Sequence, residues 1–172
     1  TTKKQNNVDA FKYFYDNEGK LTDYTDLVNN NSINYSYNLL GMLTGLTNTN
    51  GLSFRMTYDK YNRVDSYTSS LFGRTYKTRY IYGDPTSYKG QKADFVYGIE
   101  RDGVQKMAYS YDEFGRLTSR LLNTASAQVP TNFTYLDGTG NNTTTLLGSI
   151  QTGNGTRFSY TYDELGNITT IA

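Results

Sequence analysis

The sequence contains no histidine, no cysteine and no tryptophan. Histidine is the usual proton shuttle at neutral pH, cysteine is the thiol nucleophile, and the two together provide the common zinc ligands. Without cysteine the chain forms no disulfide, so the sequence gives no direct evidence about its redox compartment. This composition favours a non-enzymatic protein that holds no cofactor and no metal ion.

Long hydrophobic runs and an excess of one charge are also missing. No apolar segment approaches the ~20 residues that a membrane-spanning helix needs, and residues 1–10 are polar, unlike a signal peptide. The 17 basic and 16 acidic residues are interspersed and leave a net charge of +1. Nucleic-acid surfaces usually carry a basic patch. We therefore expect no nucleic-acid partner and no membrane insertion. Because the sequence starts without methionine, we expect a fragment of a longer polypeptide.

Tyrosine is abundant: the chain has 18 tyrosines and 8 phenylalanines but only 2 prolines. Aromatic residues occupy every second position over residues 11–15 and again over residues 158–162. Alternation with a period of two predicts β-strands with one half-buried face. The scarcity of proline leaves such strands uninterrupted.

Each of these segments continues into the same short motif. Residues 11–22 align with residues 107–118 and 158–169, and weaker copies lie at 33–44 and 54–65. Self-similarity at a period of about 20 to 30 residues indicates a repeat protein. The structural signature of the repeats consists of Tyr15, Asp16, Gly19, Tyr37, Gly41, Tyr58, Asp59, Asn62, Tyr111, Asp112, Gly115, Tyr162, Asp163 and Gly166.

The motif predicts a tight turn. Aspartate at the first position accepts a hydrogen bond from the backbone two residues on. Glycine at the fourth position supplies the left-handed conformation of a type I turn with a G1 bulge. Asn62 replaces that glycine in one copy, and asparagine tolerates a positive φ better than most residues. A return strand follows each turn, so every repeat is expected to be an antiparallel β-hairpin.

Isolated hairpins are only marginally stable in water. Successive hairpins must therefore pair edge to edge, and the expected fold is all-β, with tandem antiparallel hairpins in one continuous sheet. We expect residues 1–172 to form a single array of about seven repeats. Degenerate copies lie around residues 76–106 and 131–150.

The segment Tyr-Asp-Glu-Phe-Gly-Arg-Leu at residues 111–117 resembles the signature of YD repeats, also called Rhs repeats. The same Tyr-Asp dipeptide occurs at residues 15–16, 58–59 and 162–163, and the resemblance extends over residues 11–171. Similar proteins are bacterial Rhs and wall-associated proteins and the B and C components of insecticidal toxin complexes. The resemblance implies a sheet that spirals into part of a hollow shell, here as an internal stretch of repeats.

In the bacterial members such a shell commonly encloses a toxin or effector segment of a secreted or surface-displayed protein. The resemblance thus implies a structural module whose partners are the neighbouring repeats and that segment. The repeated aspartates are expected to be structural, because a paired-carboxylate hydrolase needs two acids that converge in a pocket.

An alternative remains open. Rows of exposed tyrosines also suit a carbohydrate-binding module for cell-wall or host glycans, since ring faces match the apolar faces of sugars. Finally, unpaired strand edges seek partners. Self-association of the fragment through its sheet edges is therefore expected.

Overall fold

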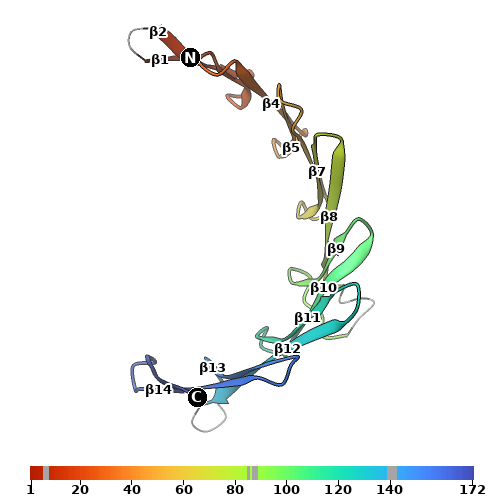
Figure 1. Ribbon diagram of the computed structural model, residues 1–172, viewed down its shortest axis with the longest axis vertical. Helices are drawn as coiled ribbons and strands as arrows, with labels where there is room; N and C mark the ends of the chain where they lie inside the picture. Colours follow the sequence, from red (N-terminus) through yellow and green to blue (C-terminus); the bar gives the residue numbers. More distant parts are fainter. Residues whose placement is uncertain (6–7, 85, 87–88, 139–142) are drawn as a thin grey trace. The chain divides into compact units, whose positions relative to one another are not determined.

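The computed structural model describes residues 1–5, 8–84, 86, 89–138 and 143–172. These residues form β-strands joined by turns and contain no helix, and accordingly no helix that could span a membrane. Figure 1 shows the strands following one another in chain order.

Fifteen strands are present in the described part of the chain. They are β1 (Thr2–Gln5), β2 (Val8–Tyr15), β3 (Leu21–Asp26), β4 (Asn31–Tyr37), β5 (Leu43–Asn48), β6 (Ser53–Tyr58), β7 (Val64–Leu71), β8 (Arg74–Tyr82), β9 (Val96–Arg101), β10 (Val104–Tyr111), β11 (Leu117–Asn123), β12 (Gln128–Asp137), β13 (Thr143–Thr152), β14 (Arg157–Tyr162) and β15 (Ile168–Ile171).

Strand order in the sheet equals strand order in the chain, because each strand pairs with the one before it and the one after it. Strands β1 to β8 and β10 to β15 pair antiparallel. The predicted all-β fold, with tandem antiparallel hairpins in one sheet, is confirmed. The chain divides into two compact units. The first holds residues 1–79 and 101–103, and the second holds residues 80–100 and 104–172.

Because neighbouring strands run antiparallel, the turns alternate between the two ends of the strands, which we call rims. In the first unit the turns after β2, β4 and β6 share one rim, and those after β3 and β5 share the opposite rim. In the second unit the turns after β10 and β14 share a rim. The signature residues lie in the turns after β2, β4, β6, β10 and β14. The topology therefore places the repeat motif on one rim of each unit.

The register separates an aromatic face from a polar face. Tyr24 lies opposite Tyr13 on one side and Ile33 on the other, and directly opposed residues share a face. The ring centroids of Tyr13 and Tyr24 are 5.3 Å apart. The next residue on each strand belongs to the opposite face. There Asp23 lies opposite Phe14 on one side and Asn34 on the other, so this face is mainly polar.

Burial in this sheet is shallow. Ala10, with 2% of its surface exposed, is the one apolar residue of the described chain that is almost completely buried. The polar residues buried to a similar depth are small and hydroxylated, such as Ser66 and Ser149, which are 1% and 3% exposed. Each shares a hydrogen bond with a threonine hydroxyl on the preceding strand. Half-buried rings and hydrogen bonds, rather than a dry core, therefore hold the repeats together, which explains the preference for tyrosine over aliphatic residues.

Candidate functional site

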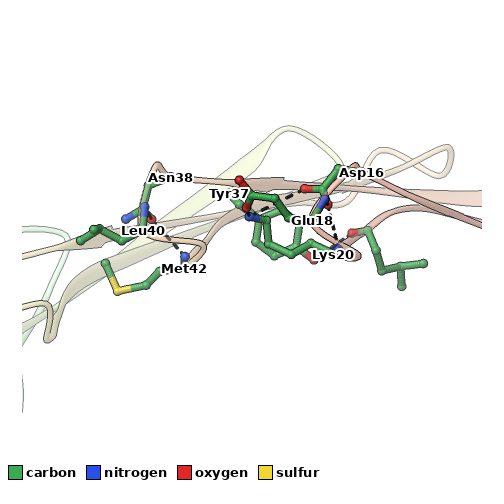
Figure 2. A network of polar contacts seen from close by, with 8 residues as sticks. Asp16, Glu18, Lys20, Tyr37, Asn38, Leu40 and Met42 are labelled. Atoms are coloured by element: carbon green, nitrogen blue, oxygen red, sulfur yellow. Dashed lines mark hydrogen bonds and ion pairs between the residues drawn. The ribbon is translucent and has the colours of Figure 1, made fainter.

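The first signature turn follows β2 and is shown in Figure 2. Asp16 Oδ1 accepts hydrogen bonds from the backbone N–H groups of Glu18 at 2.9 Å and Lys20 at 2.8 Å. The Gly19 N–H donates to the Asp16 carbonyl at 3.1 Å, and the Asp16 N–H donates to the Lys20 carbonyl at 2.9 Å. Gly19 has a φ of +82°. These bonds define a type I turn closed by a G1 bulge, with the carboxylate bound to its own backbone.

The same geometry recurs in the other signature turns. Asn38, Asp59, Asp112 and Asp163 each accept backbone hydrogen bonds at positions two and four residues on. The fourth residues Gly41, Asn62, Gly115 and Gly166 have φ values of +77°, +63°, +84° and +81°. Asn38 makes its two bonds with an amide oxygen (Figure 2). The turn thus requires an oxygen acceptor and not a charge.

Sequence reasoning missed a turn of this type on the opposite rim, in which an asparagine is the acceptor. Asn48 Oδ1 accepts from the N–H groups of Asn50 at 3.1 Å and Leu52 at 2.8 Å, and Gly51 has a φ of +83°. The signal was present, since a glycine follows Asn48 at the same spacing of three. It was overlooked because no tyrosine precedes Asn48.

The signature tyrosines connect each hairpin to the one before it. Tyr37 donates its hydroxyl hydrogen to the carbonyl of Leu21, the first residue of the preceding return strand, at 2.8 Å. The same bond joins Tyr58 to Leu43 at 2.7 Å, Tyr111 to Val96 at 3.0 Å, Tyr135 to Leu117 at 2.9 Å and Tyr162 to Leu147 at 2.9 Å. Phenylalanine could not make this bond, which explains why tyrosine precedes the turn.

Two of the tyrosines depart from the sequence interpretation. Tyr135 lies in the degenerate copy at residues 131–150 and is not followed by aspartate, yet it makes the junction bond. Tyr15 carries the full motif but is 51% exposed, because no return strand lies beside its hydroxyl in the described chain. The junction bond therefore depends on a preceding hairpin and not on the Tyr-Asp dipeptide alone.

The basic residue after the turn strengthens the junction. Arg116 donates from Nε to Asp112 Oδ2 at 2.6 Å and from Nη1 to the Thr144 carbonyl at 2.6 Å. Its guanidinium carbon lies 4.6 Å from the ring centroid of Tyr135. Lys20 Nζ lies 5.9 Å from the ring centroid of Tyr37 in the first unit. Each cation thus joins its own turn to the tyrosine of the next hairpin.

The turn carboxylates are held in the charged form. Hydrogen bonds from the Lys20 and Glu18 backbone lower the pKa of Asp16 below its ordinary value, and the Asn167 side-chain amide does the same for the pKa of Asp163. Partial burial raises the pKa of Asp59 and of Asp112, but hydrogen bonds from Arg63 and Arg116 outweigh it, so both pKa values end below the ordinary one.

The structure distributes the signature residues, one set at each junction, and does not converge them on one centre. In the part of the chain that the structure describes, no group of three or more acidic residues is arranged to hold a metal ion. Burial raises the pKa of Tyr111, so its hydroxyl remains a hydrogen-bond donor. What this arrangement does is lock neighbouring hairpins together.

No protein-family model matches the sequence, and no curated protein matches it. Among solved structures, the chain is similar to a chain of TcdB2-TccC3-TEV at 16% identity and a TM-score of 0.48, over 89% of this chain and 10% of that one. A TcdB2-TccC3-Cdc42 chain is similar at 13% identity and a TM-score of 0.34, over 95% of this chain and 12% of that one. A porin-like protein from Bacteroides uniformis is similar at 15% identity and a TM-score of 0.47, over 94% and 80%.

The chain spans about a tenth of the length of the two TcdB2-TccC3 chains. At these identities and TM-scores the likenesses carry no argument about function. The TcdB2-TccC3 chains are toxin-complex proteins with YD-repeat shells, the family that the repeat signature of this chain resembles.

Proposed function

We propose that this chain is a structural repeat module, one part of the wall of a β-shell that encloses a toxin or effector segment of a larger secreted or surface-displayed bacterial protein. The observation that carries the proposal is the junction bond, in which a signature tyrosine donates to the preceding return strand, as Tyr37 does to Leu21. The polar groups of the motif are used between neighbouring hairpins and inside turns, which suits a wall better than a reactive centre.

The two faces of the sheet support the same role. One face carries half-buried aromatic rings, as at Tyr13 and Tyr24, and the other carries polar groups, as at Asp23 and Asn34. A wall needs two different faces, one for its contents and one for its surroundings. Because each hairpin binds only its neighbours, such a wall can extend without a growing core.

The test compares the parent protein with a variant that lacks residues 1–172, using limited proteolysis of the enclosed segment. We expect the segment to be cleaved much faster in the deletion variant. The triple variant Tyr37→Phe, Tyr58→Phe and Tyr111→Phe keeps every ring but loses three junction bonds, and it should give intermediate protection. Equal cleavage in the intact protein and the deletion variant would contradict the proposal.

A second candidate is glycan binding, which exposed tyrosine rings favour. Tyr61 is 62% exposed and Tyr76 is 39% exposed. Cations already lie against these rings, since Arg63 is 5.0 Å from the Tyr61 centroid and Arg101 is 4.5 Å from that of Tyr76. A glycan array probed with the chain and with its Tyr61→Ala and Tyr76→Ala variants tests this candidate. Binding that disappears in either variant supports it, and a blank array opposes it.

A further inference from the structure

A cavity of about 570 Å³ lies in the second unit, where the repeat pattern is interrupted. Its walls come from the end of β8, the connection between β8 and β9, the start of β9, and β10 with its signature turn. The volume falls in the range of ligand sites, roughly 300 to 1,000 Å³. The lining residues that carry the argument are Tyr82, Tyr97, Tyr109, Tyr111, Lys89 and Glu113.

The connection between β8 and β9 is longer than any signature turn and is fastened to the sheet. The Gly83 N–H donates to the Phe95 carbonyl at 2.9 Å, and the Lys92 N–H donates to the Tyr97 hydroxyl at 3.1 Å. A Cβ at Gly83 would overlap the Lys92 carbonyl oxygen, so this close approach requires glycine. Insertions into repeat proteins often form the binding face, and this one forms a wall of the cavity.

The tyrosine rings give the cavity aromatic walls. The centroids of Tyr97 and Tyr111 are 5.3 Å apart and their planes are inclined by 75°, so the two rings form a corner and not a stack. The Tyr109 hydroxyl donates to Met107 Sδ at 3.2 Å, and a thioether is a weak acceptor. The faces of tyrosine rings attract cations, above all substituted ammonium groups. These walls therefore suit an organic cation.

Two charged side chains of opposite sign also line the cavity. Asp112 is bound to Arg116 at 2.6 Å, but the adjacent Glu113 is exposed and has no ion-pair partner among the described residues. Lys89, on the connection, is likewise exposed and has no ion-pair partner in the described part of the chain. Lys89 would repel a simple cation and Glu113 a simple anion. A ligand that carries both charges is attracted by both side chains.

We propose that this cavity binds a small zwitterion, whose substituted ammonium group lies against the tyrosine rings and Glu113 and whose anionic group meets Lys89. A neutral ligand would leave both charges unpaired, which distinguishes this site from the glycan candidate at Tyr61 and Tyr76. The site is also independent of the shell wall. The junction bonds of the array involve neither Lys89 nor Glu113.

The probe is glycine betaine, titrated into the chain and followed by isothermal titration calorimetry. We expect saturable binding. The tert-butylacetate anion has the same shape and the same carboxylate, but carbon replaces the charged nitrogen. It should bind at least about threefold more weakly, the low end of a cation–π contribution. Choline keeps the ammonium group without the carboxylate and should bind about 2- to 5-fold more weakly, as the loss of one exposed ion pair predicts.

The two charges are tested by separate variants, and both side chains are exposed, so the fold should be unaffected. Glu113→Gln should weaken betaine and choline by a similar factor. Lys89→Gln should weaken betaine but not choline, because choline has no anionic group. The matched controls are Glu164→Gln, at the same position of the turn after β14, and Lys60→Gln in the first unit. Both controls should bind betaine like the unmodified chain.

The aromatic wall is tested at Tyr109. Tyr109→Phe keeps the ring and should keep betaine binding, whereas Tyr109→Leu removes the ring and should weaken binding at least about threefold. Circular dichroism checks that both variants are folded. If Tyr109→Leu does not fold, the comparison of betaine with the tert-butylacetate anion decides the role of the rings.

Equal affinities for betaine and the tert-butylacetate anion would overturn the proposal, because the cavity would then be an apolar hollow. The same holds if Glu113→Gln and Glu164→Gln give equal affinities, or if betaine shows no saturable binding. Glucose is titrated as the neutral comparison. Glucose binding that exceeds betaine binding and is lost in Tyr109→Leu would assign the cavity to a glycan, and the inference would be wrong.

Discussion

Replacing Gly115 with alanine tests the turn geometry and its surroundings together. Gly115 has a φ of +84°, and a left-handed conformation costs a residue with a Cβ roughly 1 to 2 kcal/mol. The new Cβ would also lie 2.8 Å and 2.9 Å from two carbons of the Phe95 ring. That ring packs on Tyr111 with centroids 4.8 Å apart, so it cannot move away without losing contact. Overpacking of this kind costs about 1 to 3 kcal/mol.

The matched control is Gly19→Ala. Gly19 has a similar φ of +82°, but a Cβ built there meets no atom within 4 Å. We therefore expect Gly19→Ala to lose about 1 to 2 kcal/mol of unfolding free energy, and Gly115→Ala to lose about 2 to 5 kcal/mol. Urea unfolding followed by circular dichroism measures the difference. Hydrogen exchange at Leu117 shows whether the damage is local to the hairpin.

Equal losses in the two variants would refute the role assigned to Phe95. The sequence alone suggests that Gly115→Asn should be mild, because Asn62 occupies the same position in another turn. The structure changes that expectation, since an asparagine Cβ at position 115 would meet the same ring. The mild effect of asparagine is instead expected at Gly19, where a Cβ meets no atom within 4 Å, and at Gly166, where the nearest atom, Leu146 Cδ2, is 3.9 Å away.

Four further outcomes are expected. Tyr111→Phe should cost about 1 kcal/mol of unfolding free energy, the net value of the Tyr111 hydrogen bond to the Val96 carbonyl. The control Tyr109→Phe should cost less, and equal losses in the two variants would contradict the junction bond. Asp59→Ala should cost about 1 kcal/mol more than Asp59→Asn, which keeps the oxygen acceptor, as urea midpoints would show. The pKa of each turn aspartate is lower in the folded chain than in the unfolded chain, so the ionised carboxylates stabilise the fold. This stabilisation is complete above the unfolded pKa of about 4 and is lost as the pH falls through the folded pKa values. The urea concentration at the unfolding midpoint should therefore decrease when the pH is lowered below about 4. The chain should self-associate weakly through the edge of Ile168–Ile171, with a sedimentation coefficient that rises with concentration and does so less in Ile171→Lys.

The strands and the signature turns could be predicted because their causes are local. Alternating rings fix a strand face, and an aspartate followed three residues later by glycine fixes a turn. The partner of Tyr37 could not be predicted in this way. Its acceptor is a backbone carbonyl 16 residues earlier, and every residue has such a carbonyl. Only the register between two strands selects the one at Leu21.

The contact between Phe95 and Gly115 escaped the sequence for a related reason. Phe95 ends the connection from Gly83, whose N–H donates to the Phe95 carbonyl at 2.9 Å. In the sequence, residues 76–106 are recognisable only as a degenerate copy that interrupts the repeat pattern. Its packing against the next hairpin depends on where the connection folds back, which no local motif encodes. The Asn48 turn was local and could have been found with a rule that did not require tyrosine.

The junction bonds have a consequence for the order of folding. Each spans 15 to 18 residues, so a chain that emerges residue by residue from a ribosome completes a junction as soon as two hairpins are clear. Contacts of such short range close quickly because little loop entropy is lost. The most recently formed strand then serves as the template for the next. Growth proceeds from the first hairpin towards the last, and no distant segment has to arrive before the earlier part is stable.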